Sequence, residues 1–451
     1  MTGKEVSLVE MLDAREMRMQ RQLSLQQKYS SGLICFTMNI AGPVKNNRLI
    51  HRAFEYGCEI LKTQLVSTGV ECLHQESYSE DTGNEGYFCV KGSAVKIKKI
   101  TAEIENNLSI GRLFDMDVLD ENGNHIERTE IGESPRVCLI CRNPAKECAR
   151  NRTHSVPELQ HMTEKLLLKE FQEQDSRKIA ELACRSLLYE VCTTPKPGLV
   201  DCRNSGSHKD MDCFTFMASA AALWPYFQKC AQLGMETAQE SPEETFRRLR
   251  WTGKVADYEM NQATNGVNTH KGALFSIGIL CGALGRLPRD QWKNVKAVSG
   301  ECAAMTKGLV EHDFREVTKE NAGTTGEKLY VKYGITGIRG QAEKGFPAVV
   351  ETGLPVLEKG LKKGLSLEQA GCGVLLALMV STVDTNLIAR SNRKTQLQVT
   401  EEIREILGKN PYPEEDMLEI IDRAFISKNL SPGGSADLLA FTYFLYFLKE
   451  Q

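Results

Sequence analysis

The chain changes character at residues 157–176, PELQHMTEKLLLKEFQEQDS, a charged stretch with no glycine and no proline after its first residue. Such a run of helix-forming residues predicts a single helix. Strand patterns precede it, whereas almost none follow it. The helix could link two domains or belong to either one. We set the expected boundary within it and predict domains at 1–165 and 166–451.

Composition predicts a soluble globular protein. The chain has 41% hydrophobic and 25% charged residues, and its 451 residues exceed what one hydrophobic core usually holds. The net charge of −3 argues against a general surface for nucleic acid or membrane, so we expect neither as a partner. An anionic substrate must therefore be held by local groups.

The sequence also favours a cytoplasmic location. Its beginning, MTGKEVSLVEML, lacks the charged-then-apolar pattern of a signal peptide. The longest apolar stretches, 373–383 and 438–448, are too short to span a bilayer. The 15 cysteines are odd in number and mostly stand singly in expected helices, which favours reduced thiols over a disulfide framework.

The two parts differ in expected fold class. The first mixes helix and strand patterns and predicts an α+β domain. Its expected helices are 5–29 and 49–66, and its expected strands are 33–39, 87–90, 93–104, 112–119 and 125–130. The second part predicts an all-α helical domain. Its expected helices are 176–191, 214–233, 243–264, 273–284, 292–310, 346–362, 367–383, 397–407, 414–427 and 436–449.

The loop 194–212, TPKPGLVDCRNSGSHKDMD, is the densest in functional groups. Prolines on either side of Lys196 fix the backbone and remove two amide donors, which predicts a lysine presented to a ligand rather than packed. Its acids supply the hard oxygen ligands that a magnesium–polyphosphate needs. The polar residues of the loop include Asp201, His208, Lys209, Asp210 and Asp212.

Four further loops of the helical part carry similar groups. In TNGVNTHKG, 264–272, a glycine-bearing loop enters a helix N-terminus and directs free amides at an anion, and Lys271 adds a positive charge. The others are YGITGIRGQAEKGFP at 333–347 with Arg339, DTN at 384–386 with Arg390, and SPGGSAD at 431–437. Helical domains gather ligands from loops at one end, so these groups can converge.

Each of these residues also has a plainer interpretation. Asp384 or Asp437 alone would more often be a helix cap or a solvent-facing acid, and His270 could be a satisfied polar core residue. Glu259 is more simply explained as part of a solvated helix face. The coincidence of five such loops in one helical domain favours a shared site.

Several motifs carry a family resemblance from about residue 177 to the C-terminus. They are TPKPGLVD, SHKDMD, GVNTHKG, GIRGQAEKGFP, DTN and GGSADLLA, and they closely resemble triphosphoribosyl-dephospho-coenzyme A synthase. The resemblance implies an all-α fold and a reaction of ATP with 3'-dephospho-coenzyme A. Its products are 2'-(5''-triphosphoribosyl)-3'-dephospho-coenzyme A and adenine. The sequence departs from the expected Gly, Glu and Gly at Asn265, Gln341 and Ser391, and Gln341 argues against a catalytic carboxylate there.

This chemistry gives the triphosphate its expected ligands. Mg²⁺ would be held by Asp210 and Asp212. Phosphate and nucleotide contacts would come from Lys196, Lys209, Asn268, Lys271 and Arg339.

The same chemistry needs proton transfer at two places. Asp201 or Asp384 would be the base that takes the proton from the ribose 2'-hydroxyl of dephospho-coenzyme A. His208 or His270 would contact the departing adenine or protonate it. The reacting ribose carbon becomes oxocarbenium-like, so a nearby carboxylate would stabilise it.

In the first part, GRLFDMDV at 111–118 places Asp115 and Asp117 two residues apart on an expected strand. Residues i and i+2 share one face, so both carboxylates can reach the same Mg²⁺, as in nucleotidyltransferases. For an isolated D-x-D, a strand end with two exposed acids is the commoner explanation.

The segment RVCLICRNPAKECARNRTH, 136–154, follows it. Its three cysteines and one histidine could form a Cys₃His zinc site that begins with a C-x₂-C knuckle. The spacing is only moderately typical of zinc sites, and the segment is cationic, so we favour phosphate binding. The zinc candidates are Cys138, Cys141, Cys148 and His154, and the basic residues are Arg142, Lys146, Arg150 and Arg152.

With LICFTMN at 33–39 and AGPVKN at 41–46, these motifs resemble citrate lyase holo-acyl-carrier-protein synthase over residues 5–162. The resemblance implies an α+β nucleotidyltransferase-like fold. It also implies that a serine of the apo-acyl carrier protein of citrate lyase attacks the α-phosphate of the triphosphoribosyl compound and releases pyrophosphate. Asp115 and Asp117 would hold Mg²⁺, and His154 would be a base or a structural residue. The phosphate ligands would be Lys45, Arg112, Arg136, Arg150 and Arg152.

The product of the second implied reaction is the substrate of the first, which makes a fusion of the two domains intelligible. Two alternatives stay open. One is the same prosthetic-group chemistry for malonate decarboxylase, against which the C-x₂-C and GRLFDMDV patterns count. The other is a non-catalytic citrate lyase assembly protein, against which the intact aspartate pairs count.

Overall fold

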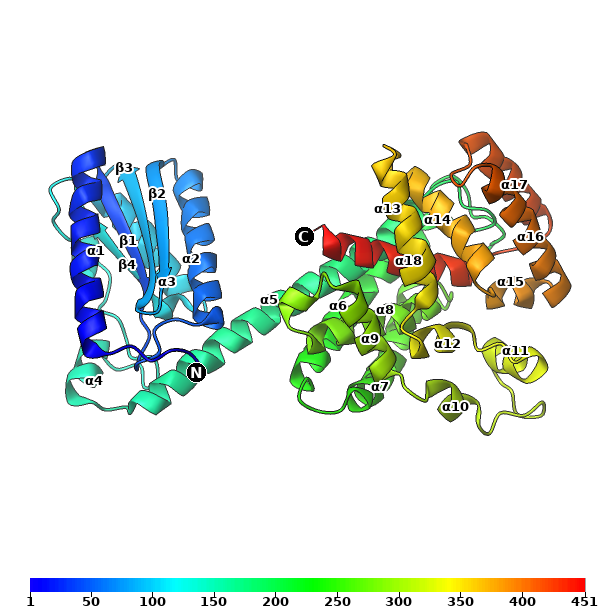
Figure 1. Cartoon of the computed structure of the whole chain (residues 1–451), viewed down its shortest axis with the longest axis horizontal. Coiled ribbons are helices and arrows are strands. Elements are labelled where there is room, and N and C mark those ends of the chain that lie inside the picture. Colours follow the sequence, from blue (N-terminus) through cyan, green and yellow to red (C-terminus); the bar gives the residue numbers. More distant parts are fainter. Residues whose placement is uncertain (451) are drawn as a thin grey trace. The chain divides into compact units, whose positions relative to one another are not determined.

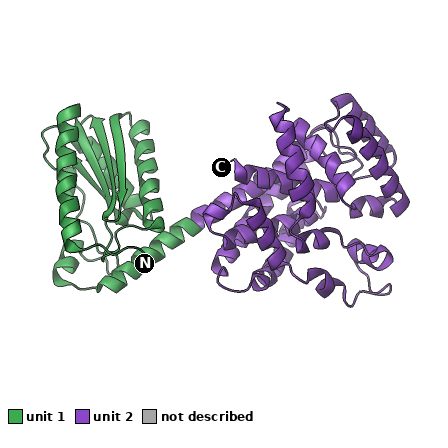
Figure 2. Ribbon diagram, viewed as in Figure 1, with its two compact units in different colours: residues 1–172 green, residues 173–451 purple. Residues whose placement is uncertain are grey.

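The computed structural model describes residues 1–450. It contains two compact units, Met1–Gln172 and Glu173–Gln451 (Figure 2). Helix α5, Val156–Cys192, crosses this division, so the stretch 157–176 is part of one long helix. Residue 165, next to which we expected the boundary, lies inside α5. In the described part of the chain, no helix is long and apolar enough to cross a membrane.

The first unit is a four-stranded antiparallel sheet with helices on both faces (Figure 1). The strands lie in the order β2-β3-β1-β4. Helices α2 and α3 pack on one face, and α1 packs on the other. The strands are β1 (Gly32–Met38), β2 (Glu71–Glu80), β3 (Gly83–Lys91) and β4 (Phe114–Leu119), and the helices are α1 (Leu8–Tyr29), α2 (Arg48–Ser67), α3 (Ala94–Asn107) and α4 (Ala145–Asn151).

The alternation of side chains along β1 explains why the sheet is covered twice. Ile34 and Phe36 belong to the core beneath α2 and α3, whereas Leu33 and Cys35 belong to a smaller core beneath α1. An apolar strand with both faces buried needs helices on both sides. The α+β class expected for this part is therefore confirmed.

One expected strand of this unit is wrong. Residues 93–104 lie mostly in helix α3, whose buried face is built by Ile97, Ile100 and Ile104. These three residues have helical spacing, but the overlapping segment AVKIKK, 94–99, also alternates like a strand. The segment forms a helix because helical spacing lets all three isoleucines pack into the core beside the sheet.

A second expected strand of this unit is also wrong, and one strand was missed. Residues 125–130 contain only a single bridge from His125 to Leu119 and a 3-10 turn at Arg128–Ile131. Strand β2 was not predicted, because it lies at the edge of the sheet and is mostly polar.

The described residues of the second unit form helices joined by loops, without a strand, as expected for an all-α domain. Ten of the helices after α5 are longer than eight residues, and the others are short. Its helices after α5 are α6 (Cys213–Glu236), α7 (Pro242–Ala263), α8 (Lys271–Arg286), α9 (Val295–Met305), α10 (Leu309–Phe314), α11 (Thr325–Tyr333), α12 (Gly337–Glu343), α13 (Leu354–Lys362), α14 (Leu367–Ser381), α15 (Thr385–Arg390), α16 (Arg393–Lys409), α17 (Glu415–Ser427) and α18 (Gly433–Lys449).

Glycines bring α6 and α8 into backbone contact. A methyl group on Gly285 would overlap the carbonyl oxygen of Ala231, and one on Gly234 would overlap the carbonyl oxygen of Gly282. Nearly every residue of α8 is buried. This close packing fixes α8, and the loop that enters its N-terminus is fixed with it.

Several helix boundaries of the second unit differ from expectation. The expected helix 292–310 is divided into α9 and α10 at Gly308, whose φ of +72° is left-handed. The expected helix 346–362 begins with a π-helical segment, Ala348–Gly353, before α13. The loops quoted at 333–347 and 384–386 contain or enter the short helices α12 and α15.

Candidate active site

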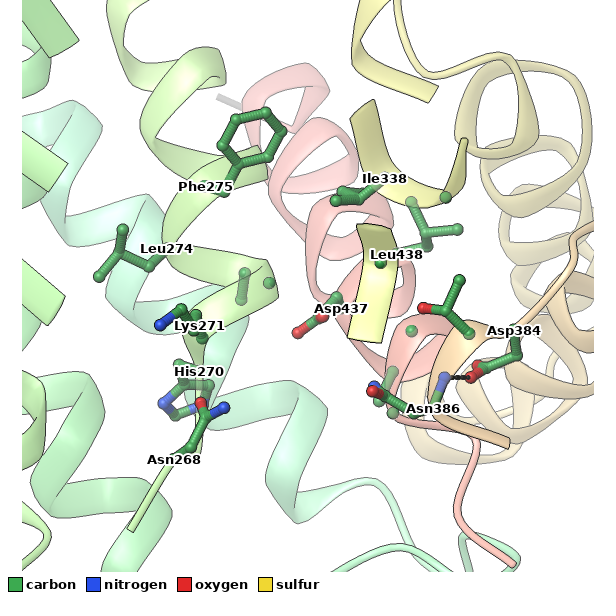
Figure 3. A pocket seen from close by; sticks show the side chains of 18 of the residues that line it. Asn268, His270, Lys271, Leu274, Phe275, Ile338, Asp384, Asn386, Asp437 and Leu438 are labelled. Carbon is green, nitrogen blue, oxygen red and sulfur yellow. Dashed lines mark hydrogen bonds between the residues drawn. The ribbon is translucent and has the colours of Figure 1, made fainter. Parts of the chain in front are cut away.

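One cavity of about 1280 Å³ in the second unit brings the chemically dense loops together. Figure 3 shows Asp437 between the wall that carries His270 and Lys271 and the wall that carries Asp384 and Asn386. Of the residues expected from the sequence, those that line the cavity are Lys196, His208, Asp210, Asn268, His270, Lys271, Arg339 and Asp384. Those that do not line it are Asp201, Lys209 and Asp212.

Lys196 is packed, although its two flanking prolines predicted a lysine presented to a ligand rather than packed. Its side chain is 1% exposed, and its Nζ donates to the carbonyl oxygen of Glu190 at 2.7 Å and to the Glu190 carboxylate. Both residues line the cavity. A buried lysine keeps its charge only with such a partner, so the pair forms one unit of the wall. Glu190 was not predicted, because it is one of many glutamates in α5.

Asp201 organises the loop instead of facing the cavity. Its carboxylate accepts backbone N–H bonds from Lys196 at 2.9 Å, Arg203 at 2.8 Å and Asn204 at 3.0 Å. These bonds use both carboxylate oxygens. Asp201 is therefore a turn-forming residue that holds Lys196 in place.

The expected Asp210–Asp212 pair is split by the fold. Asp212 is the N-cap of α6, where its Oδ1 accepts from the backbone N–H of Thr215 at 2.8 Å and from the Thr215 hydroxyl at 2.7 Å. These hydrogen bonds lower the pKa of Asp212. Asp210 alone of the two lines the cavity, where it is exposed.

Asp384 is buried and its oxygens are occupied. Oδ1 accepts from the backbone N–H groups of Asn386 and Leu387, both at 3.0 Å, as the N-cap of α15. Oδ2 accepts from the N–H of Ser435 at 2.8 Å and from its hydroxyl at 2.9 Å. Burial raises the pKa of Asp384 in spite of these bonds. Asp384 thus ties the start of α15 to the start of α18.

Asp437 lines the cavity and has few fixed partners. Its carboxylate lies against the first turn of α8, where a methyl group on Gly272 would collide with its Oδ2. The Ala273 amide stabilises its charged form, but burial, Glu190 and Asp384 together raise its pKa well above the usual range. A carboxyl group with a raised pKa beside a cavity is suited to accept a proton.

Two histidines of the cavity are held in the neutral form. Burial and the nearby Lys196 lower the pKa of His270 to about 3. Its Nδ1 lies 2.8 Å from the Ser219 hydroxyl, and its buried Nε2 has no hydrogen-bond partner among the described residues. Burial and Arg390 also lower the pKa of His208. Arg390 Nη2 donates to Nδ1 of His208 at 3.0 Å, so Nε2 carries the proton and donates to Ser431 Oγ at 3.0 Å.

Guanidinium groups form the cationic part of the wall. Asp313 accepts from Arg250 at 2.6 Å and from Arg339 at 2.7 Å, and thereby places both side chains at the cavity. On α7, Arg250, Gly253, Lys254 and Asp257 line the cavity with the spacing of one helix face. That spacing was the available signal in the sequence, but Glu259, interpreted as part of a solvated face, was the only residue of this helix that we considered individually.

Lys271 stands at the first position of α8. Its Nζ lies 3.1 Å from Oδ2 of Asp257, whose other oxygen is buried without a hydrogen-bond partner in residues 1–450. The first turn of α8 points its free amides at the same cavity. The anion-binding loop expected at 264–272 therefore lies at the cavity.

In the first unit, Asp115 and Asp117 lie on the same face of β4, opposite to Phe114 and Met116. Arg136 Nη1 lies 3.0 Å from Asp115 Oδ1. Desolvation and the neighbouring Asp115 raise the pKa of Asp117. Two carboxylates on the same face of one strand are compatible with a divalent ion.

A pocket of about 260 Å³ is lined by Arg112, Arg128 and Arg136 around Glu105, and Arg136 links it to Asp115. Glu105 accepts from Arg128 at 2.7 Å, from Arg136, and from the backbone N–H of Met116 at 2.9 Å. Arg112 donates to the carbonyl oxygen of Val137, and its buried Nε has no partner among the described residues. Burial and Arg136 lower the pKa of Arg112.

The structure brings only part of the expected phosphate ligands to this pocket. Arg112 and Arg136 line it, and Arg128 joins them without having been predicted. Lys45, Arg150 and Arg152 do not line it. Lys45 instead donates to the carbonyl oxygen of Ile40 at 2.6 Å.

The Cys₃His candidate comes together in space. The ligand atoms of Cys138, Cys141, Cys148 and His154 all lie within 4.8 Å of one another. Sequence spacing alone left this grouping open, because Cys148 and His154 belong to α4 and the segment after it.

Comparisons with known proteins match both units. A family model described as ATP:dephospho-CoA triphosphoribosyl transferase matches residues 176–451, and one described as apo-citrate lyase phosphoribosyl-dephospho-CoA transferase matches residues 6–170. The chain is similar to two relatives called Protein CitXG. The one from Haemophilus influenzae is 35% identical over 98% of this chain and 96% of its own length. The one from Leuconostoc mesenteroides subsp. cremoris is 33% identical over 98% and 97%.

A shorter relative covers about two thirds of the chain. It is the 2-(5''-triphosphoribosyl)-3'-dephosphocoenzyme-A synthase of Haemophilus ducreyi, 37% identical over 68% of this chain and 99% of its own length. The two family matches follow one another along the chain and together span nearly all of it. The chain therefore belongs to the CitXG family, in which an apo-citrate lyase phosphoribosyl-dephospho-CoA transferase domain is followed by an ATP:dephospho-CoA triphosphoribosyl transferase domain.

Proposed function

We propose that this chain makes the prosthetic group of citrate lyase and attaches it to the acyl carrier protein, with synthesis in Glu173–Gln451 and transfer in Met1–Gln172. The observation that carries the proposal is the large cavity of the helical unit, where cations and the Asp437 carboxyl group, which has few hydrogen-bond partners, meet at a helix N-terminus. Such a site suits a triphosphate beside a reacting sugar.

In the synthesis reaction, the 2'-hydroxyl oxygen of 3'-dephospho-coenzyme A bonds to C1' of the ATP ribose. The bond from C1' to N9 of adenine breaks, adenine takes the electron pair and a proton, and the 2'-hydroxyl loses its proton. We assign the base to Asp437, because its carboxylate faces the cavity and its pKa is raised. Asp201 and Asp384, the bases expected from the sequence, have their oxygens occupied by backbone donors and position the loops instead.

His270 supports this reaction as a neutral group. With a pKa of about 3 it cannot be the acid that protonates adenine near neutral pH. Its unpartnered Nε2 offers a hydrogen bond to a bound ligand. We therefore propose an adenine contact for His270 in place of the acid role.

The triphosphate would be held by the cationic wall. Arg250 and Arg339 are fixed by Asp313, Lys271 stands at the α8 N-terminus, and Lys254 lies on the same face of α7 as Arg250. Asp210 would hold Mg²⁺ together with phosphate oxygens, because its carboxylate is exposed at the cavity while Asp212 is used as a helix cap. When bound, Mg²⁺ neutralises triphosphate charge.

In the transfer reaction, the serine hydroxyl of the carrier protein attacks the α-phosphate of the triphosphoribosyl compound, and pyrophosphate leaves. The Arg112, Arg128 and Arg136 pocket would bind the phosphates, and Asp115 and Asp117 would hold Mg²⁺ beside them. The sheet with helices on both faces supports a nucleotidyltransferase-like assignment for this unit. The match to an apo-citrate lyase transferase model favours the citrate lyase carrier over that of malonate decarboxylase.

All 15 cysteines are unpaired thiols in the structure, which supports placing both reactions in the reducing cytoplasm.

The synthesis reaction can be tested without a carrier protein. The full chain is incubated with ATP, Mg²⁺ and 3'-dephospho-coenzyme A, and adenine is measured by chromatography. Adenine should form only when both substrates are present. Adenine formation that does not depend on dephospho-coenzyme A would indicate a hydrolase and would contradict the assignment.

A further inference from the structure

We propose that the first unit binds one Zn²⁺ through Cys138, Cys141, Cys148 and His154. Their ligand atoms lie within 4.8 Å of one another, and the Sγ atoms of Cys141 and Cys148 are 3.4 Å apart. Tetrahedral zinc, with Zn–S near 2.3 Å and Zn–N near 2.0 Å, requires ligand separations of about 3.5–3.8 Å. The four groups are thus within about 1 Å of zinc geometry without any change of fold.

The local backbone explains how the four ligands are presented. The C-x₂-C turn is closed by the N–H of Cys138, which donates to the carbonyl oxygen of Asn143 at 2.6 Å. Within it, the N–H of Ile140 points at Cys138 Sγ at 3.5 Å, which is how a turn supports a thiolate. Cys148 lies in α4, and His154 follows the left-handed residue Arg152 that ends this helix. The C-x₂-C turn, which carries two of the ligands, therefore faces the end of α4, which carries the other two.

The alternatives explain the cluster less well. A phosphate site needs cations that point inward, whereas the inward groups here are thiols and an imidazole, with Cys138 only 6% exposed. The buried Nε2 of His154 has no hydrogen-bond partner in the described chain, which is costly for a polar atom. A disulfide between Cys141 and Cys148 would leave Cys138 and His154 unexplained. Four protein ligands with no open position describe a structural zinc site.

The site lies directly beside the arginine pocket. The carbonyl oxygen of Arg136 accepts from the Ala145 N–H at 2.9 Å, at the start of α4. The carbonyl oxygen of Val137 accepts from Arg112, and the Arg136 side chain reaches Glu105 and Asp115. Zinc would thus fix the segment that places Arg112 and Arg136 beside Asp115. This positioning role, unlike the zinc site itself, rests on the transfer reaction proposed above.

The zinc site is tested on the full chain by elemental analysis after purification. We expect about one zinc per chain, and Cys141→Ser and Cys148→Ser should each lose it. Cys72→Ser, an exposed thiol in strand β2 of the same unit, is the matched control and should keep it. Wild-type chain without metal, or with iron in place of zinc, would overturn the proposal. So would full zinc content in both ligand variants.

A second measurement does not depend on how the variants fold. Wild-type chain loaded with Co²⁺ should show the visible absorption of tetrahedral cobalt with thiolate ligands, and added Zn²⁺ should abolish it. An octahedral cobalt spectrum would contradict the Cys₃His assignment.

The positioning role has its own readout. Cys141→Ser should keep adenine formation by the second unit and lose at least about ten-fold in carrier modification, as zinc-site changes commonly do. Unchanged carrier modification with zinc absent would refute the positioning role and leave the zinc site standing. If the wild-type chain formed no adenine, this result would instead contradict the proposed function.

Discussion

Asp437 and Asp384 are acids that line the same cavity, yet their surroundings give them different tasks. Backbone and hydroxyl donors occupy both oxygens of Asp384, whereas Asp437 meets mainly the first turn of α8 and other acids. Both residues looked like helix caps in the sequence, and only the structure separates the cap from the candidate base. Hydrogen-bond partners from distant loops make this distinction, and no local pattern encodes them.

Replacing Asp437 by Asn should therefore reduce adenine formation by at least about 100-fold, the usual contribution of a general base. The folded state should keep its stability, because the neutral amide keeps the shape of a carboxyl group whose raised pKa already favours the neutral form. Asp384→Asn is the control, and it should lower the free energy of unfolding by about 1–3 kcal/mol, because its amide group would face backbone donors. Near-normal adenine formation by Asp437→Asn would remove this residue from the reaction.

The low pKa of His270 predicts how stability changes with pH. The folded state holds this histidine neutral down to a pKa of about 3, whereas the unfolded chain protonates it near 6.5. Its contribution is therefore present above pH 6.5 and is lost as the pH falls from 6.5 toward 3. Between pH 7 and pH 5 this amounts to about 2 kcal/mol.

Urea unfolding at pH 7 and pH 5 checks the sign. The decrease in unfolding free energy between the two pH values should be about 2 kcal/mol smaller in His270→Gln than in wild type. An equal decrease in both proteins would show that His270 titrates normally in the folded state.

At the scale of elements, the sequence predicts the long segments well and the short ones poorly. Helices such as α6, α7 and α18 follow from apolar spacing, because their buried faces repeat over several turns. The segment that forms α3 was expected to be a strand, because AVKIKK fits both periods and tertiary packing decides between them. Helices α12 and α15 are too short for their period to be visible.

The contact between α6 and α8 gives a prediction for two matched glycines. Gly285→Ala should destabilise the protein by about 1–3 kcal/mol, because the new methyl group meets the backbone of α6. Gly300→Ala, in the exposed interior of α9, should stabilise it by about 0.5–1 kcal/mol, because nothing lies near the added methyl group. Chemical denaturation of both variants measures the difference. Equal effects would show that α6 and α8 are not in backbone contact.

At the scale of the whole molecule, the sequence predicts which loops form the site of the helical unit but not what each residue does there. The loops around Lys196, Lys271 and Arg339 all reach the cavity, as their density of functional groups predicted. Glu190, Arg250 and Asp313 were not predicted. In the sequence they are charged helix residues like many others, and only the fold shows that they line the cavity. Charged residues and motifs in the sequence indicate which loops form a site. The burial and the hydrogen-bond partners of each residue then indicate its role.

The division of labour between the units predicts separable variants. Asp115→Asn should keep adenine formation and lose carrier modification by about 100-fold or more, because it alters only the acids beside the arginine pocket. Asp81→Asn, an exposed acid at the β2–β3 turn of the same unit, is the control and should behave like wild type. Parallel loss of both activities in Asp115→Asn would contradict two separate sites.

The central claim is that one chain both builds and attaches the prosthetic group. Its most direct test is the intact mass of the apo-acyl carrier protein of citrate lyase after incubation with this chain, ATP, Mg²⁺ and 3'-dephospho-coenzyme A. We predict a mass gain equal to one phosphoribosyl-dephospho-coenzyme A group, with adenine and pyrophosphate released. A carrier protein of unchanged mass, with no adenine formed, would contradict the claim.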